Sequence, residues 1–70
     1  MNWPAVKGGR VLKALLKAGW YVRSNHGGSH KTLARSGSPS YTWSFGDDEE
    51  IGPRMLARIA KHTGLTPKDL

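Results

Sequence analysis

The sequence has no cysteine, no long hydrophobic run and almost no acidic residue outside one short segment. Without cysteine the chain forms no disulfide and offers neither a thiolate metal ligand nor a thiol nucleophile. Its apolar runs are a few residues long, far below the roughly 20 that a membrane-spanning helix needs, and its first residues lack the apolar stretch of a signal peptide. We therefore expect a soluble, cytoplasmic protein with no membrane partner.

Several catalytic motifs are missing as well. The sequence has no P-loop, no GxGxxG and no GxSxG, so nothing in it indicates nucleotide hydrolysis or serine esterase chemistry. Four of the acidic residues are contiguous at 47–50, which leaves no separate carboxylate to complete a two-metal nuclease site. His26 and His30 flank two glycines, but two ligands without a third make a weak zinc site. We expect neither a metal nor another cofactor.

Positive charge, in contrast, is abundant. The 70 residues are enough for one small domain spanning 1–70, and they carry 11 Lys and Arg against 5 Asp and Glu, a net charge of +6. Residues 1–46 contain no acid at all. The acidic segment 47–50 comes just before a predicted helix, where we expect it to oppose the positive end of the helix dipole. A chain this basic attracts polyanions, and RNA is the partner that we expect.

Hydrophobic spacing and turn residues predict an α-β-β-β-α order. Helical periodicity indicates helices over 8–18 and 53–63, and alternation indicates strands over 20–24, 29–35 and 41–45. Residues 25–28 supply a predicted turn, Gly64 ends the second helix, and Thr66 and Pro67 resemble the start of a further short helix. Two helices on one face of a three-stranded antiparallel sheet make an α+β sandwich with one open sheet face.

The alternation in the second predicted strand places one histidine on that open face. Leu33 is the only large apolar residue of this strand and should face the helices, so Lys31 and Arg35 share its side and His30 points away. Histidine exchanges a proton near neutral pH without a metal. On RNA, His30 would help to remove the proton of a ribose 2′-hydroxyl, which attacks the adjacent phosphate and expels the 5′-oxygen of the next nucleotide. DNA lacks this hydroxyl and should be spared.

The other predicted site residues lie around His30 in the sequence. We expect RNA to be contacted by two turn residues and three cations: Gly28, Ser29, Arg23, Lys31 and Arg35. The cations would stabilise charge on the phosphorane. The residues alone leave two alternatives open, because the same basic domain could hold structured RNA without cutting it, or its positive face could dock an acidic protein.

Three segments occur in an order that is similar to a known family. They are the helical segment 11–20 (VLKALLKAGW), the triplet Gly28-Ser29-His30, and the segment 50–61 (EIGPRMLARIAK), which Thr63-Gly64-Leu65 follows. Together they cover most of the chain and resemble the HicA (YcfA-like) family of small bacterial and archaeal toxins.

The resemblance implies a fold like that of double-stranded-RNA-binding domains, metal-independent cleavage of mRNA, and restraint by a HicB-type antitoxin. It also implies that the family's catalytic histidine falls on His30. The chain departs from the family pattern at Gly27, where members often carry a basic residue, and its segment 25–27 is slightly longer. His26 is therefore kept as a second or substitute proton carrier.

Overall fold

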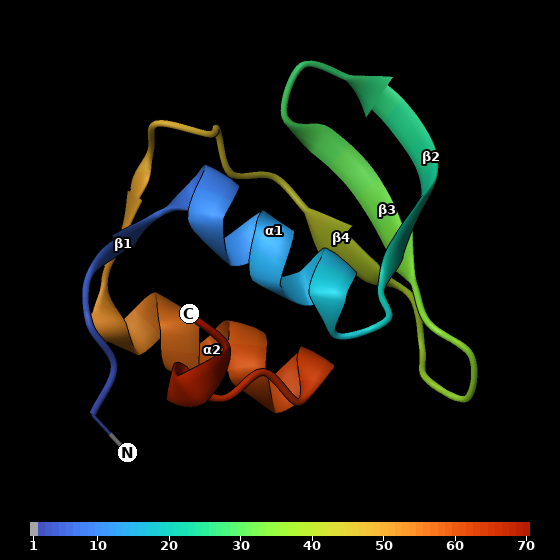
Figure 1. Cartoon of the computed structure of the whole chain (residues 1–70). Helices are drawn as coiled ribbons and strands as arrows, with labels where there is room; N and C mark the ends of the chain where they lie inside the picture. Colours follow the sequence, from blue (N-terminus) through green and yellow to red (C-terminus); the bar gives the residue numbers. More distant parts are fainter. Residues whose placement is uncertain (1) are drawn as a thin grey trace.

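Two helices and a three-stranded sheet form two layers in the computed structural model, which describes residues 2–70 (Figure 1). The antiparallel sheet has the order β2-β3-β4, with β2 at Tyr21–Gly27, β3 at His30–Ala34 and β4 at Tyr41–Trp43. The helices α1 (Gly8–Lys17) and α2 (Pro53–Thr63) lie on the same side of this sheet. The predicted α+β architecture is therefore confirmed.

The core lies between the two layers, where apolar residues at helical spacing meet the inner face of the sheet. Its most deeply buried large side chains are Val11, Leu15, Trp20, Leu33, Trp43, Ile51, Leu56 and Ile59. Leu33 is 0% exposed, as its predicted inward orientation requires. Burying one such side chain contributes about 1.5–3 kcal/mol, so this single residue fixes which face of β3 turns inward.

The β2 strand contains two irregularities that the sequence pattern does not reveal. Its pairing with β3 shifts between Val22 and Ser24 and again between Asn25 and Gly27. Each bulge adds a residue to β2 alone and changes which face the following side chains take. The slightly longer segment 25–27 is thereby absorbed into the strand.

The predicted turn over 25–28 is wrong for the same reason. The strand runs on to Gly27, which pairs with His30, and Gly28 and Ser29 make the reversal. Gly28 has φ 57° at the first central position, the place where a two-residue hairpin turn of type II′ takes a glycine. A positive φ there costs glycine nothing, whereas a side chain would be strained.

A second, two-stranded sheet was not predicted from the sequence because its strands are too short to show alternation. β1 (Val6–Lys7) pairs antiparallel with β5 (Glu50–Ile51). This pairing brings the acidic segment to α1, where the backbone N–H of Gly8 donates to Glu49 O at 2.8 Å. The first turn of α2 holds no acid. The expectation that residues 47–50 oppose the dipole of the second helix stays a prediction, and the structure adds that the backbone of this segment caps the first helix.

The remaining boundaries differ from the prediction by one or two residues. α1 ends at Lys17, and β4 ends at Trp43, whose indole donates a hydrogen bond to the Phe45 carbonyl at 3.1 Å. Gly64 ends α2 with φ 78°, and a 3-10 turn at Pro67–Asp69 confirms the predicted short helix. None of the helices within residues 2–70 has the length and apolar character to cross a membrane.

Candidate functional site

The candidate site lies on the outer face of the sheet, which the helices leave uncovered (Figure 1). The β3 strand itself is regular, so His30 and Thr32 point outward while Leu33 points inward. Thr32 pairs with Ser24 on one side and with Thr42 on the other. Side chains paired in this way lie next to one another. The outer face is therefore polar and rich in hydroxyl groups.

His30 is the first residue of β3 and stands directly after the hairpin turn. Its side chain is exposed, and none of the side-chain hydrogen bonds within residues 2–70 engages its ring. Ser29, beside it in the turn, is half-buried and lies near Gly46. The turn thus holds the imidazole at the edge of the outer face with both ring nitrogens open to a ligand.

His26 occupies the same face but is tethered. Its Nε2 lies 2.9 Å from Thr32 Oγ1 and 3.2 Å from Ser24 Oγ. Thr32 and His30 are two positions apart on one side of β3, a separation of about 7 Å along the strand. The structure therefore brings two imidazoles to one face, one held by hydroxyl groups and one free.

Arg23 is the one predicted RNA-binding cation that the structure places on the outer face. Its Nη1 donates to Ser40 Oγ at 3.1 Å, so the side chain reaches across β3. Ser40 lies on the outer side because its neighbour Tyr41 turns inward and stacks on His62 of α2, with 5.7 Å between ring centroids. This contact holds Arg23 toward the end of the face that is remote from the hairpin turn.

Lys31 and Arg35 lie on the inner, helical side, at opposite ends of β3. Lys31 Nζ donates to the carbonyl of Gly28 at 3.4 Å. Arg35 Nη1 donates to Ala18 O at 3.5 Å, and its guanidinium lies 4.8 Å from the ring centroid of Trp20. The structure therefore does not gather the three predicted cations around His30; their side chains lie on both faces of the sheet.

The shifted pKa in the structure belongs to the helical side as well. Burial raises the pKa of the Tyr41 hydroxyl above its ordinary value of 10.0, and the positive charge of Arg58 offsets part of this rise. Within residues 2–70, no group of three or more His, Cys, Asp or Glu side chains is placed to hold a metal ion.

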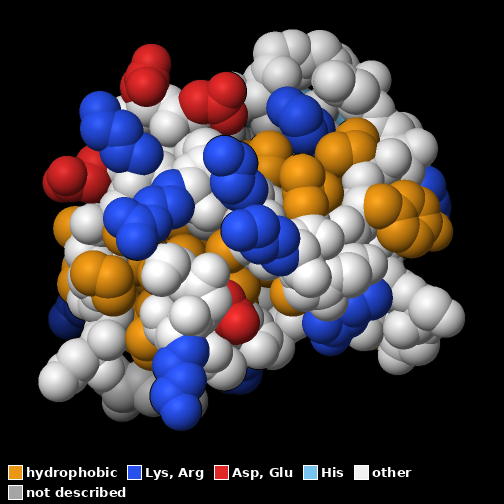
Figure 2. All heavy atoms as spheres, in the orientation of Figure 1, with side chains coloured by type: hydrophobic (Ala, Val, Ile, Leu, Met, Phe, Trp, Pro, Cys, Tyr) orange, Lys and Arg blue, Asp and Glu red, His pale blue; other side chains and the backbone are white. Residues whose placement is uncertain are grey.

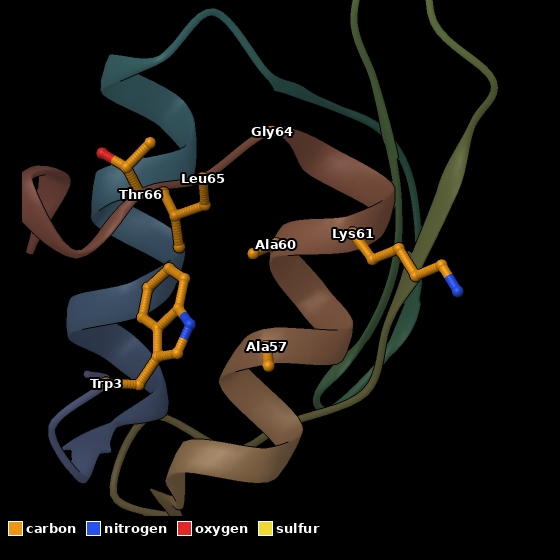
Figure 3. Close-up of a pocket in the computed structure, with 7 residues that line it drawn as sticks. All are labelled: Trp3, Ala57, Ala60, Lys61, Gly64, Leu65 and Thr66. Carbon is orange, nitrogen blue, oxygen red and sulfur yellow. The ribbon is translucent and has the colours of Figure 1, made fainter. Parts of the chain in front are cut away.

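A hollow of about 490 Å³ lies beside α2, and its lining is mostly apolar (Figure 3). The residues around it are Trp3, Ala57, Ala60, Lys61, Gly64, Leu65 and Thr66. Figure 3 shows the Trp3 ring facing Ala57 and Ala60, whereas the Lys61 side chain extends outward. None of the predicted site residues lines this hollow, so it is separate from the candidate site.

Sequence reasoning missed the contacts of His26. Ser24 and His26 share a parity on β2, and His30 and Thr32 share one on β3, so each pair was visible in the sequence. The bulge between Val22 and Ser24 sets Ser24 opposite Thr32 and so joins the two pairs. The residue pattern does not predict that bulge.

The family model for the HicA toxin of bacterial toxin–antitoxin systems matches residues 8–65, which include both helices and the whole three-stranded sheet. No curated protein and no solved structure matches the chain. The match extends over well more than half of the 70 residues. The chain therefore belongs to the HicA toxin family of bacterial toxin–antitoxin systems.

Proposed function

We propose that the chain is an endoribonuclease that cleaves mRNA without a metal ion and uses His30 as its proton-transfer group. The observation that carries the proposal is the imidazole of His30, exposed at the hairpin turn on the uncovered face of the sheet with no hydrogen-bond partner among the described residues. A histidine free of internal partners is able to take and return a proton at neutral pH.

The reaction needs no nucleophile from the protein. His30 takes the proton of a ribose 2′-hydroxyl while the 2′-oxygen forms a bond to the adjacent phosphorus. The bond from phosphorus to the 5′-oxygen of the next nucleotide breaks, and that oxygen receives a proton. The products are a 2′,3′-cyclic phosphate and a free 5′-hydroxyl. His26 is the group we expect to supply the second proton, since it lies on the same face with Thr32 between the two rings.

A toxin of this kind requires a partner that restrains it. The outer face is polar and uncovered, so we expect a HicB-type antitoxin to cover His30 in the cytoplasm with complementary side chains. The partner would then block the imidazole directly, without unfolding the toxin.

The test compares RNA cleavage by the purified wild-type chain, His30→Ala and His26→Ala. We expect His30→Ala to lose about 10²–10⁴-fold in rate, which is the usual contribution of a positioned acid or base. His26→Ala should lose less, because the wild-type His30 remains. The products should carry cyclic phosphate ends, chelating agents should leave the rate unchanged, and DNA of the same sequence should stay intact.

Circular dichroism and thermal unfolding provide the control for folding. His30→Ala should match the wild type because its side chain is exposed, and His26→Ala should keep the fold because it loses only exposed hydrogen bonds. Equal cleavage by His30→Ala would refute the assignment of the proton-transfer group. A wild-type chain that binds RNA without cutting it would instead identify a binding module.

A further inference from the structure

The α1 helix carries a continuous row of cations on the side of the molecule opposite the outer sheet face. Arg10, Lys13 and Lys17 are exposed. At about 100° per residue they fall within roughly 60° of one another around the helix axis. Figure 2 shows several Lys and Arg side chains together over this side of the molecule, with most of the Asp and Glu side chains in that view near one edge. These three residues are called the α1 cationic face below.

The same three side chains line a shallow hollow of about 140 Å³. Ala14 forms part of its floor, and Asp69 and Leu70 complete the lining. The Asp69 carboxylate is already engaged, because its Oδ2 accepts hydrogen bonds from the N–H and the hydroxyl of Thr66 at 2.7 and 3.0 Å. None of the hydrogen bonds within residues 2–70 engages the charged groups of the α1 cationic face. Their positive charges are open to an external anion.

The outer face needs help to hold a polyanion. Arg23 is the one predicted cation that its strands present there, and one of its N–H groups is used by Ser40. Neutralised phosphates supply much of the affinity of a protein for nucleic acid. A single cation on the outer face neutralises few phosphates, whereas α1 carries three exposed cations.

We propose that the α1 cationic face binds the phosphate backbone of the RNA substrate away from the cut. This inference rests on the proposed function, because it names where the nuclease holds the rest of its substrate. The α1 helix has no acidic residue in its first turn and has Lys17 in its last turn. None of its own side chains therefore repels a phosphate chain. The hollow is large enough for a phosphate group. The side chains of the α1 cationic face remain accessible along the helix.

The chain between α1 and the sheet offers a path from one layer to the other. Leu16, Tyr21 and Val22 are large apolar side chains with exposed fractions of 44%, 55% and 40%. They lie at the end of α1 and the start of the edge strand β2. Aromatic side chains stack with unpaired bases, so an RNA strand that leaves the α1 cationic face meets the Tyr21 ring, with apolar Leu16 and Val22 beside it, before it reaches the outer face.

The experiment measures the affinity of a labelled single-stranded RNA for the full chain in the His30→Ala background, at several salt concentrations. The double variant Lys13→Gln/Lys17→Gln removes two charges from exposed helix positions. It should bind roughly 10- to 30-fold more weakly at about 0.1 M salt, and its salt slope should fall by about 1.4. The matched control is Arg54→Gln/Lys61→Gln, which removes two exposed charges from α2 and should leave the slope unchanged.

Equal losses in the two double variants would overturn the proposal, because they would show an effect of net charge alone. An unchanged RNA affinity of Lys13→Gln/Lys17→Gln would also overturn the proposal. This holds even if that variant loses the binding of an acidic antitoxin. Cleavage by the His30-containing chain is scored separately. A nuclease whose affinity ignores the α1 charges refutes this inference and keeps the proposed function. A chain that binds RNA through α1 but never cuts it refutes the proposed function and keeps α1 as a binding surface.

Discussion

Arg35 shows how a cation that looks available in the sequence is used inside the fold. Its guanidinium covers the Trp20 ring at 4.8 Å and donates to the carbonyl of Ala18, just beyond the end of α1. A cation over an aromatic ring contributes about 0.5–2 kcal/mol, and a positive charge at the end of a helix is favourable. The position therefore joins the helix layer to the sheet.

We expect Arg35→Gln to lower the free energy of unfolding by roughly 0.5–2 kcal/mol, because it removes the contact with Trp20. Urea unfolding followed by tryptophan fluorescence measures this loss. Lys31→Gln is the matched control at the other end of β3 and should change stability by less than about 0.5 kcal/mol, since its ammonium makes one long hydrogen bond. If Arg35→Gln keeps full stability and loses RNA affinity, the residue is an RNA contact instead.

The orientation of single residues was predictable where one apolar side chain settled it. Leu33 is the only large apolar residue of its strand, so alternation alone placed His30 on the opposite face. The same logic put Lys31 and Arg35 on the helical side, and the structure agrees. Alternation could not predict which residues a long side chain contacts. Whether an arginine ends over a tryptophan or in solvent depends on its neighbours from distant segments.

At the scale of elements, the start of α1 depends on a close approach of two backbones. Gly8 is buried, and its N–H donates to Glu49 O at 2.8 Å. A Cβ at this position would overlap the carbonyl oxygen of Gly46. Neither backbone segment can move without breaking the cap of the helix. Glycine is therefore required here by space.

We expect Gly8→Ala to cost about 1–3 kcal/mol of stability, the usual range for overpacking a buried site. Thermal and urea unfolding measure it. Gly46→Ala is the matched control on the other side of the same contact, where a Cβ would stand at an ordinary 3.6 Å from Ser29 Oγ. It should be neutral or slightly stabilising, because alanine restricts the unfolded chain. A neutral Gly8→Ala would mean that the two segments separate freely.

The longer elements were predictable because their periodicity repeats several times. Val11 and Leu15 mark the inner side of α1, and Leu56 and Ile59 that of α2. The bulges of β2 and the two-residue strands β1 and β5 left no such signal. A bulge is one residue long, and a two-residue strand shows no alternation. Both are fixed by tertiary pairing between segments that are distant in the sequence.

At the scale of the whole molecule, the exposed His30 imidazole and the α1 cationic face lie on different layers. The principal-axis extents are 30 × 27 × 17 Å, so an RNA of more than a few nucleotides is longer than the molecule is thick. The sequence predicted the excess of positive charge but placed it around the histidine. The structure places the free imidazole on the outer sheet face and the α1 cationic face on the helical side.

This separation predicts how salt should act on catalysis, given the two proposals above. Raising salt from about 50 to 200 mM screens the α1 cationic face and weakens binding, so KM should rise. The single-turnover rate at a saturating concentration of the chain should stay within about twofold. The reason is that the proposed proton transfer uses the exposed His30 imidazole, and no hydrogen bond among residues 2–70 joins that ring to a cation. Single-turnover cleavage over a titration of chain concentration separates the two quantities. A saturated rate that falls in parallel with affinity would show that cations act on the reacting phosphate itself, and would return Arg23 or Lys31 to the centre of the site.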